Sequence, residues 1–174
     1  GPDGHEAVPV VGGRHRNDID LFVLQSLAYI LNAVGFVLEL RVDELGTALE
    51  EAGIRVHEVD RGGQVTFHGP GQLVAYPVVD LREWGGPVKY VRTLERIIID
   101  SLADFNITAE TIDGITGVWV NGAKIAAIGV KIARGIAYHG FAINVTTDLS
   151  YYDNIVPCGI TGCPVTSMTE VLGA

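Results

Sequence analysis

A chain of 174 residues is long enough to bury a hydrophobic core, and its 48% hydrophobic and 19% charged residues are typical of one globular domain, residues 1–174. No apolar run approaches the roughly 20 residues that span a bilayer, and a formal net charge of -9 argues against nucleic acid, which needs a positive surface. Two cysteines are too few for a disulfide scaffold, so we expect a cytoplasmic protein with no membrane and no nucleic-acid partner.

The first half of the chain has the pattern of two helices and several strands. Residues 20–34 are apolar on much of the expected helical surface, which predicts a largely buried helix. Residues 43–52 predict a second, amphipathic helix that Gly53 is placed to end. Short apolar runs predict strands at residues 36–41, 54–59, 64–67 and 72–79.

The second half begins with the clearest helix signal. This helix is expected to start near Pro87, because proline is favoured in the first helical turn. Its expected core face repeats at three- and four-residue steps: Val88, Val91, Leu94, Ile98, Leu102 and Phe105. Asn121-Gly122 predicts a tight hairpin turn. Strands are expected at residues 107–112, 117–120, 124–132 and 141–145. Many strands with two or three long helices predict an α+β fold.

Lys124 begins the strand that follows the hairpin turn. The two-residue alternation of a strand is expected to put Ala126 and Ile128 on the same face as Lys124. A lysine in this position is often only a strand-end charge that reaches water. The small residues Ala126, Ala127 and Gly129 nevertheless leave space beside it, as in a strand that lines a pocket.

Two further segments contain residues suited to chemistry or ligand binding. Residues 61–72 hold four glycines beside Arg61 and His68. Such a backbone can approach a ligand closely, although two tight turns would need the same glycines. Cys158 lies in a Pro-Cys-Gly turn that could present its sulfur to a pocket, whereas most lone cysteines are small buried apolar residues. His139 is either the base of a Cys–His pair or a core histidine, and core histidines are the more common case.

The run RGGQVTFHGPGQLVAY at residues 61–76 resembles the signature of the lipoyl(octanoyl) transferase family, the octanoyl-[acyl-carrier-protein]:protein N-octanoyltransferases. KIAAIGVKI, YHGFAINV and IVPCGI follow in that family's order and at similar spacing. Four ordered motifs across residues 61–167 are far more specific than one. The resemblance implies the fold of the biotin/lipoate–protein ligase catalytic domain, a mixed sheet with helices packed on one side.

The resemblance also implies a role for each motif. Cys158 would accept the octanoyl group as a thioester, and Lys124 would lie beside it as acid and base. An ammonium close to a thiol favours the thiolate, so we expect Lys124 to set the thiolate fraction of Cys158. The implied substrate-binding residues are Arg61, Gly62, Gly63, Gln64, Val65, Thr66, Phe67, His68, Ala127, Ile128, Gly129, Gly140, Phe141 and Ala142.

The implied reaction needs no cofactor, because the donor thioester is already activated. The donor would be octanoyl acyl carrier protein. The acceptors would be lipoyl domains of 2-oxoacid dehydrogenase complexes and the glycine cleavage H protein. Cys158 and Cys163 are not followed by a second ligand pair at zinc-like spacing, so no metal is expected.

Two departures from the family pattern keep other interpretations open. The expected Glu-His-Pro strand and the loop after it are absent from the divergent N-terminal part, and the chain ends at Ala174, where relatives continue into a further helix. An ATP-dependent lipoate–protein ligase and a non-catalytic acyl- or carrier-binding domain are the alternatives. Two basic groups are candidate docking sites for an acidic carrier or ordinary solvated charges: Lys89, Arg92 and Arg96, and Lys131 and Arg134.

Overall fold

The structure is a computed structural model, which describes residues 37–39, 55–57, 59–63, 65–155 and 163–173. The helices expected at residues 20–34 and 43–52 lie outside these ranges, as do Gln64 and Cys158. The description below concerns the ranges given.

The larger sheet is antiparallel throughout. Its strand order is β4-β9-β8-β7-β6, and β5 also pairs with β9. The strands are β4 (Gln72–Ala75), β5 (Val79–Asp80), β6 (Glu110–Ile112), β7 (Ile115–Val120), β8 (Ala123–Ala133) and β9 (Ile136–Asn144). Strands β6 to β9 confirm, with shifted ends, the strands expected at residues 107–112, 117–120, 124–132 and 141–145, whereas the single strand expected at residues 72–79 is two strands, β4 and β5. The long β8–β9 hairpin forms the centre of the sheet.

A smaller sheet has the order β2-β1-β3. Strand β1 (Val37–Glu39) pairs in parallel with β2 (Arg55–His57) and antiparallel with β3 (Thr66–His68). Among the described residues, this parallel pair makes the smaller sheet a mixed one. Strands and helices are combined without a regular βαβ alternation, which confirms the expected α+β class.

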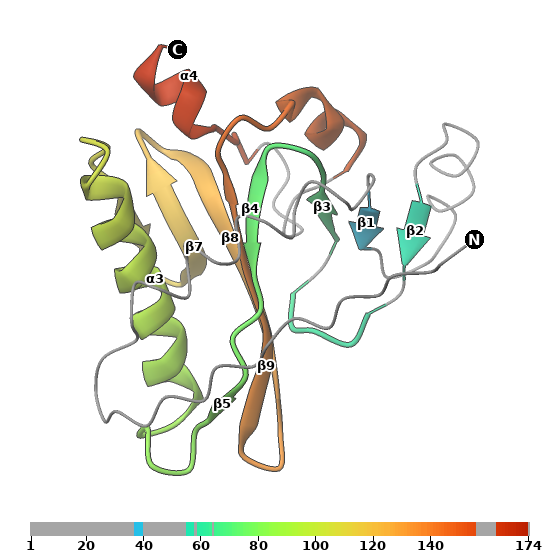
Figure 1. Ribbon diagram of the computed structural model, residues 1–174, viewed down its shortest axis with the longest axis vertical. Helices are drawn as coiled ribbons and strands as arrows, with labels where there is room; N and C mark the ends of the chain where they lie inside the picture. The colour runs from blue at the N-terminus through green and yellow to red at the C-terminus, as the bar shows by residue number, and fades with distance from the viewer. Residues whose placement is uncertain (1–36, 40–54, 58, 64, 156–162, 174) are drawn as a thin grey trace, which may run out of the picture.

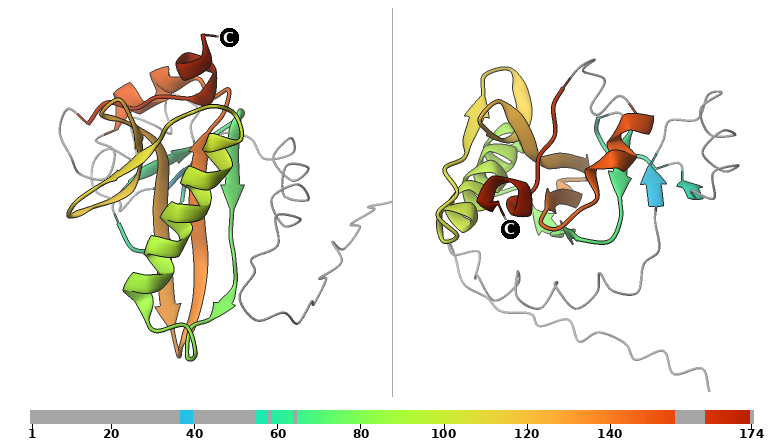
Figure 2. Two further views of the ribbon diagram at one scale, coloured as in Figure 1. Left: turned by 90° about the vertical axis from the view of Figure 1, so that its left-hand side faces the viewer. Right: turned by 90° about the horizontal axis from the view of Figure 1, so that it is seen from above.

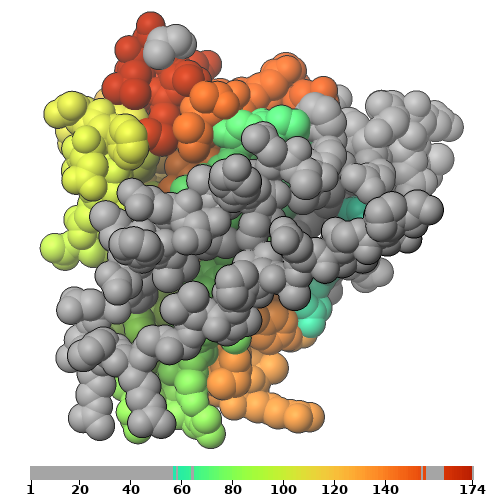
Figure 3. Space-filling model, viewed as in Figure 1, coloured from blue at the N-terminus to red at the C-terminus, as the bar shows by residue number. Residues whose placement is uncertain are grey.

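The two sheets and one long helix form layers. Helix α3 (Pro87–Ala103) packs along one face of the larger sheet, and the smaller sheet lies on the other side of it (Figures 1 and 2). The 3-10 helix η1 (Leu149–Asn154) and the short helix α4 (Met168–Leu172) lie at one end of the molecule, and the turn of the β8–β9 hairpin protrudes at the other (Figure 3). None of the helices in the described residues is both long and apolar enough to cross a membrane.

Helix α3 starts at Pro87 as expected, and its buried face follows a four-residue step. The apolar side chains on this face are at most 2% exposed: Tyr90, Leu94, Ile98 and Leu102. The expected core face is wrong at its two ends. Val88 is 75% exposed because it lies on a different side of the first turn from Tyr90, and Phe105 is 56% exposed because it follows the end of the helix.

The hairpin turn between β7 and β8 is confirmed. Asn121 has a φ of 51° and Gly122 a φ of 80°. Two consecutive residues with positive φ are the backbone requirement of a two-residue hairpin turn, and Asn-Gly is the pair that meets it at least cost. The turn therefore begins β8 at Ala123, immediately before Lys124.

A bulge follows this turn within β8. Trp119 is the cross-strand partner of Lys124, whereas the preceding residue, Val118, is the partner of Ala126. Ile125 is therefore an extra residue with no partner of its own on β7, which is the definition of a β-bulge. Ile125 and Ala126 are both buried in the core beneath α3. Two successive side chains thus lie on the same face.

The bulge changes which residues lie on the same face as Lys124. Simple alternation predicted that Ala126 and Ile128 would share that face, and this prediction is wrong, because both pack toward the core beneath α3. Lys124 lies instead on the face that is turned away from α3, together with Ala127 and Gly129. Alternation counts fail across a bulge because two residues occupy the space of one.

We expect Ile98→Ala to destabilise the fold by about 2–5 kcal/mol, because it removes a completely buried side chain from the α3–sheet core. Val88→Ala on the same helix is the control and should change stability by no more than about 0.5 kcal/mol. Urea unfolding of the three proteins measures both effects. Equal losses in the two variants would contradict the assignment of the buried face.

Candidate active site

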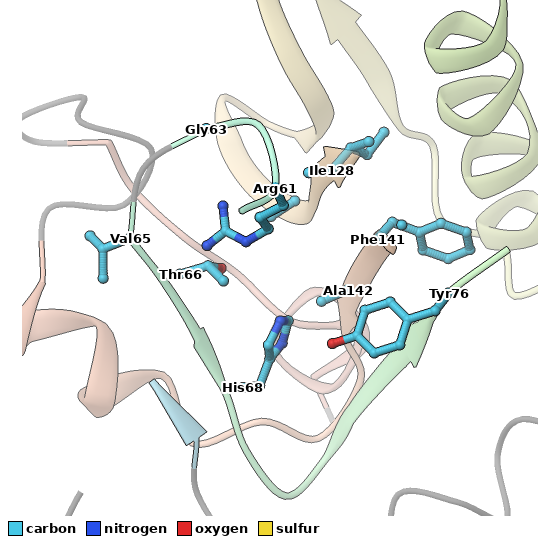
Figure 4. Close-up of a pocket in the computed structure, with 12 residues that line it drawn as sticks. Arg61, Gly63, Val65, Thr66, His68, Tyr76, Ile128, Phe141 and Ala142 are labelled. Carbon is cyan, nitrogen blue, oxygen red and sulfur yellow. The ribbon is translucent and has the colours of Figure 1, made fainter. Parts of the chain in front are cut away.

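A pocket opens between strand β3 and the face of β8 and β9 that is turned away from α3 (Figure 4). Its volume is about 430 Å³ including the open solvent at its mouth. The side chains of Arg61, Thr66, His68 and Tyr76 project toward a common space in Figure 4. The central hairpin of the sheet forms the floor beneath them.

The floor of the pocket consists of small residues in cross-strand register. Ala127 pairs with Ala142, and Gly129 pairs with Gly140. Residues 61–62 cross closely over the second pair, because a Cβ at Gly129 would lie only 2.9 Å from Arg61 Cδ. Gly140 also cannot carry a side chain, because a Cβ there would lie 2.0 Å from the carbonyl oxygen of Ala75. The floor is therefore suited to a slender apolar ligand.

Strand β3 supplies the opposite wall by ordinary alternation. Thr66 and His68 line the pocket, whereas Phe67 between them is only 1% exposed and faces a second small core. There the Phe67 ring stacks on Tyr151 with 5.1 Å between centroids and meets Tyr152 edge-on at 5.6 Å. These ring contacts fix the register of β3, and so the positions of its two pocket-facing residues.

A hydrogen-bond network supports the wall from behind. The Nδ1 atom of His68 lies 3.0 Å from Oε1 of Gln72. The Gln72 amide donates to Oδ1 of Asn144 and to the hydroxyl of Tyr152, both at 2.9 Å. Asn144 donates in turn to the carbonyl oxygen of Thr166 at 3.0 Å. Buried polar groups that are mutually satisfied make a rigid network, and this one joins β4, β9 and η1.

A second, smaller pocket of about 260 Å³ adjoins the first, with which it shares Thr66 and Ala127. Its lining includes Lys124, whose side chain is only 3% exposed. Asn144 and Tyr152 complete its polar side. The larger apolar pocket therefore adjoins a smaller space whose lining includes an ammonium group.

The backbone of Lys124 is bonded to the segment that follows Cys158 in sequence. The Lys124 amide donates to the carbonyl oxygen of Pro164 at 2.8 Å, and the Thr166 amide donates to the carbonyl oxygen of Lys124 at 3.0 Å. On the other flank, Ile155 is buried in the second core. Both ends of the segment that carries Cys158 are thus anchored, although Cys158 itself lies outside the described residues.

A charged cluster fixes the start of the pocket wall. The Asp60 carboxylate accepts a hydrogen bond from Lys131 Nζ at 2.7 Å, lies 3.1 Å from His139 Nε2 and accepts from the Tyr138 hydroxyl at 3.4 Å. The Lys131 hydrogen bond is the main cause, and His139 the next, of a pKa lowered to about 2 at Asp60. Asp60 directly precedes Arg61, so the cluster ties the wall to β8 and β9.

Most of the predicted binding residues line the larger pocket: Arg61, Gly63, Val65, Thr66, His68, Ala127, Ile128, Gly129, Gly140, Phe141 and Ala142. Gly62 and Phe67 are described but do not line it, and the Gly62 amide donates to the carbonyl oxygen of Val130 at 3.0 Å. Sequence reasoning missed Tyr76, which lies just beyond β4 without a periodic pattern, and Asp60. The described residues contain no group of three or more His, Cys, Asp or Glu arranged to hold a metal.

The fold is shared with solved enzymes that modify proteins with small acids. A bipartite lipoate protein ligase from Thermoplasma acidophilum superposes with a TM-score of 0.61 at 19% identity, covering 83% of this chain and 69% of that one. A biotin protein ligase from Aquifex aeolicus superposes with a TM-score of 0.50 at 16% identity, covering 79% and 61%. These likenesses define the fold class, that of the lipoate– and biotin–protein ligases, as the sequence resemblance predicted.

Sequence relatives narrow this class to one family. An octanoyltransferase from Solibacter usitatus is 60% identical over 124 residues, or 71% of this chain and 56% of that protein. One from Flavobacterium psychrophilum is 43% identical over 159 residues, or 88% and 68%. The family model of the lipoyl protein ligase A/B catalytic domain matches residues 40–174. The chain therefore belongs to the lipoyl protein ligase A/B catalytic domain family, among its octanoyltransferases, and spans little more than half of several of these relatives.

We expect the Asp60 cluster to stabilise the protein only while the carboxylate is ionised. Because the folded pKa of Asp60 is lowered from 3.8 to about 2, its contribution is fully present above about pH 4 and is lost as the pH falls through about 2. The stabilities of wild type and Asp60→Asn should therefore converge across this interval. Urea unfolding at several pH values measures the difference. Asp153→Asn, the same change at another exposed aspartate, is the control, and a wild type–Asp60→Asn difference that is independent of pH would contradict the assignment.

Proposed function

We propose that this chain carries the catalytic site of an octanoyltransferase. It would move an octanoyl group from the thioester of an acyl carrier protein to a lysine of a lipoyl domain, through a thioester on Cys158. This is the first step of protein lipoylation, and we place it in the cytoplasm. The observation that carries the proposal is the apolar pocket beside Arg61 and Gly129, which shares Thr66 and Ala127 with the smaller pocket that contains Lys124.

The shape of the larger pocket supports an acyl chain as its ligand. Its floor includes the methyl groups of Ala127 and Ala142, which leave more space for a methylene chain than larger side chains would. Thr66 lies at the junction of the two pockets. A ligand with an apolar tail and a reactive carbonyl head would place its head at that junction.

The anchored segment supports a role for Cys158 beside Lys124. Cys158 precedes Pro164 by six residues, which limits their separation to about 21 Å at full extension. Pro164 is itself hydrogen-bonded to Lys124. That length of chain allows the thiol to reach the second pocket. A thiolate is the form that attacks a thioester, and a neighbouring ammonium favours that form.

The proposed reaction has two acyl transfers. In the first, the Cys158 thiolate attacks the carbonyl carbon of the donor, the new C–S bond forms, and the bond to the carrier sulfur breaks with release of the carrier thiol. In the second, a lysine amine attacks the same carbon, an amide forms, and the C–S bond to Cys158 breaks. The proton lost by the amine returns to the thiolate, and Lys124 is placed to carry it.

Carrier docking is better accommodated beside the pocket than on α3. The basic residues of α3 lie on the opposite side of the sheet from the pocket, where Arg92 pairs with Glu95 and Arg96 with Asp100. Lys131 and Arg134 lie on the β8–β9 hairpin, which forms the pocket floor. Of the two basic groups, the hairpin group is the one from which a bound carrier could reach the larger pocket.

We expect octanoyl carrier protein to add the mass of one octanoyl group to the wild type and to Cys163→Ala, but not to Cys158→Ala. Intact-mass analysis after mixing measures this directly, and the two cysteine variants are matched controls for one another. A parallel sample with ATP and free lipoate tests the ligase alternative. A persistent adduct in Cys158→Ala, or lipoate transfer to a lipoyl domain that depends on ATP, would contradict the proposal.

We expect Lys124→Met to move the alkylation of Cys158 by iodoacetamide to higher pH by on the order of one unit, because removing the ammonium makes the thiolate less stable. Methionine keeps the length of the side chain and removes its charge. Lys89→Met, which alters an exposed lysine on α3, is the control. Alkylation curves that coincide in wild type and Lys124→Met would mean that Lys124 does not activate the thiol.

A further inference from the structure

Lys124 combines a charge with almost complete burial. Lys124 is the second residue of β8 and is 3% exposed. Transfer of an ammonium group from water into such a site is costly unless other groups stabilise the charge. Groups around the side chain must therefore stabilise the ammonium, and Trp119 and Gly117 on β7 are two of them.

Trp119 provides one stabilising surface. It is the direct cross-strand partner of Lys124, and Lys124 Nζ lies over the indole ring, 4.7 Å from its centroid. This distance falls within the range of a cation–π interaction, for which tryptophan is the best aromatic partner. Trp119 is itself only 3% exposed, so little water screens the contact.

Two features of Trp119 indicate that it does more than fill the core. Its indole Nε1 is buried without a hydrogen-bond partner among the described residues. It also stands apart from the apolar cluster beneath α3, to which its neighbours Val118 and Val120 belong. The ring is thus kept on the ligand side of the sheet at the expense of an unsatisfied N–H group, and what it contacts there is the ammonium.

Gly117 holds the rest of the lysine side chain. A Cβ at this position would lie 3.3 Å from Cε and 3.6 Å from Cδ of Lys124, so the aliphatic stem lies in the space that a side chain would occupy. The φ of Gly117 is 135°, a conformation that other residues rarely adopt. Its amide donates to Oε1 of Glu95 at 3.2 Å, and Glu95 is 1% exposed and paired with Arg92.

We propose that Trp119 is a positioning residue for Lys124: its ring holds the ammonium group beside the second pocket, while Gly117 confines the stem. The effect of Trp119 on the reaction rests on the proposed function, because it acts through Lys124 on Cys158. The contact between the ring and the ammonium does not. The two parts can therefore be tested separately.

The first test measures the contact itself, by NMR of the protein labelled with 13C at lysine Cε. The three lysines are assigned by substitution, and the Lys124 Hε signals are expected upfield because of the Trp119 ring current. Trp119→Leu should abolish that shift, and Trp119→Phe, which keeps a smaller ring, should retain part of it. Trp84→Leu is the matched control, since this other tryptophan packs on Tyr90. An unchanged Lys124 signal in Trp119→Leu or in Trp119→Phe overturns the proposal.

The second test measures the consequence for the thiol. Alkylation of Cys158 at neutral pH should slow by about threefold to tenfold in Trp119→Leu, by less in Trp119→Phe, and not at all in Trp84→Leu. In the Lys124→Met background, Trp119→Leu should not slow the alkylation of Cys158 further, because Trp119 acts on the thiol only through the ammonium. A purely structural defect would slow alkylation in that background as well. An additive loss overturns the proposal.

The two tests separate the failure of this inference from failure of the proposed function. If Lys124→Met leaves alkylation unchanged while Trp119→Leu still removes the ring-current shift, the activation of the thiol is wrong and the contact stands. If Lys124→Met slows alkylation and neither Trp119 variant does, the activation stands and the positioning role of Trp119 is wrong. Should Trp119→Leu fail to fold, Trp119→Phe gives both readouts.

Discussion

The antiparallel pairing of β8 with β9 is the constraint on which the site depends. Its register puts Ala127 opposite Ala142 and Gly129 opposite Gly140, so small residues meet small residues at the centre of the sheet. The side chains of Ile128 and Phe141 pack on the core side, and a shift of either strand by one residue would turn one of them to the pocket side and close the larger pocket. Helix α3 stabilises this register from the other face, because the apolar side chains of β8 and β9 that face the helix must stay buried beneath it.

The bulge at Ile125, in the pairing of β8 with β7, changes the face of Lys124 relative to the residues that follow it in β8. Without it, Lys124 would lie on the same face as Ala126 and Ile128, in the apolar layer beneath α3. With it, the lysine reaches the ligand side while Ile125 and Ala126 both remain in the core. β-Bulges commonly re-aim a side chain in this way next to functional sites. A charged residue is thus placed in the middle of the sheet without disturbing the packing on its other face.

Residues 60–68 meet distant parts of the chain around the larger pocket, and different interactions hold them there. The Asp60 cluster fixes the start of the first wall, and aromatic packing of Phe67 fixes β3. Backbone hydrogen bonds join Lys124 to Pro164 and Thr166. The walls are therefore positioned largely by contacts outside the pocket.

The sequence by itself determined the local elements and the family. Pro87 and the periodic apolar residues after it predicted α3, and Asn121-Gly122 predicted the β7–β8 turn, because both signals act through the local backbone. The ordered motifs around residues 61–76 and Lys124 predicted the binding segments, because such motifs are recognised from residue types and their order, without knowledge of contacts. The family assignment was confirmed at the level of its relatives.

Only the tertiary structure decided which residues face the ligand. The extra residue at Ile125 has no sequence signature, because any apolar residue can occupy a bulge, and it reversed the predicted face of Lys124. Tyr76 and Asp60 entered the site through contacts with His139, a partner more than 60 positions away in sequence. The sequence alone does not distinguish Trp119 from a core residue, whereas the structure places its ring beneath the Lys124 ammonium. Such placements depend on strand register, which long-range packing sets.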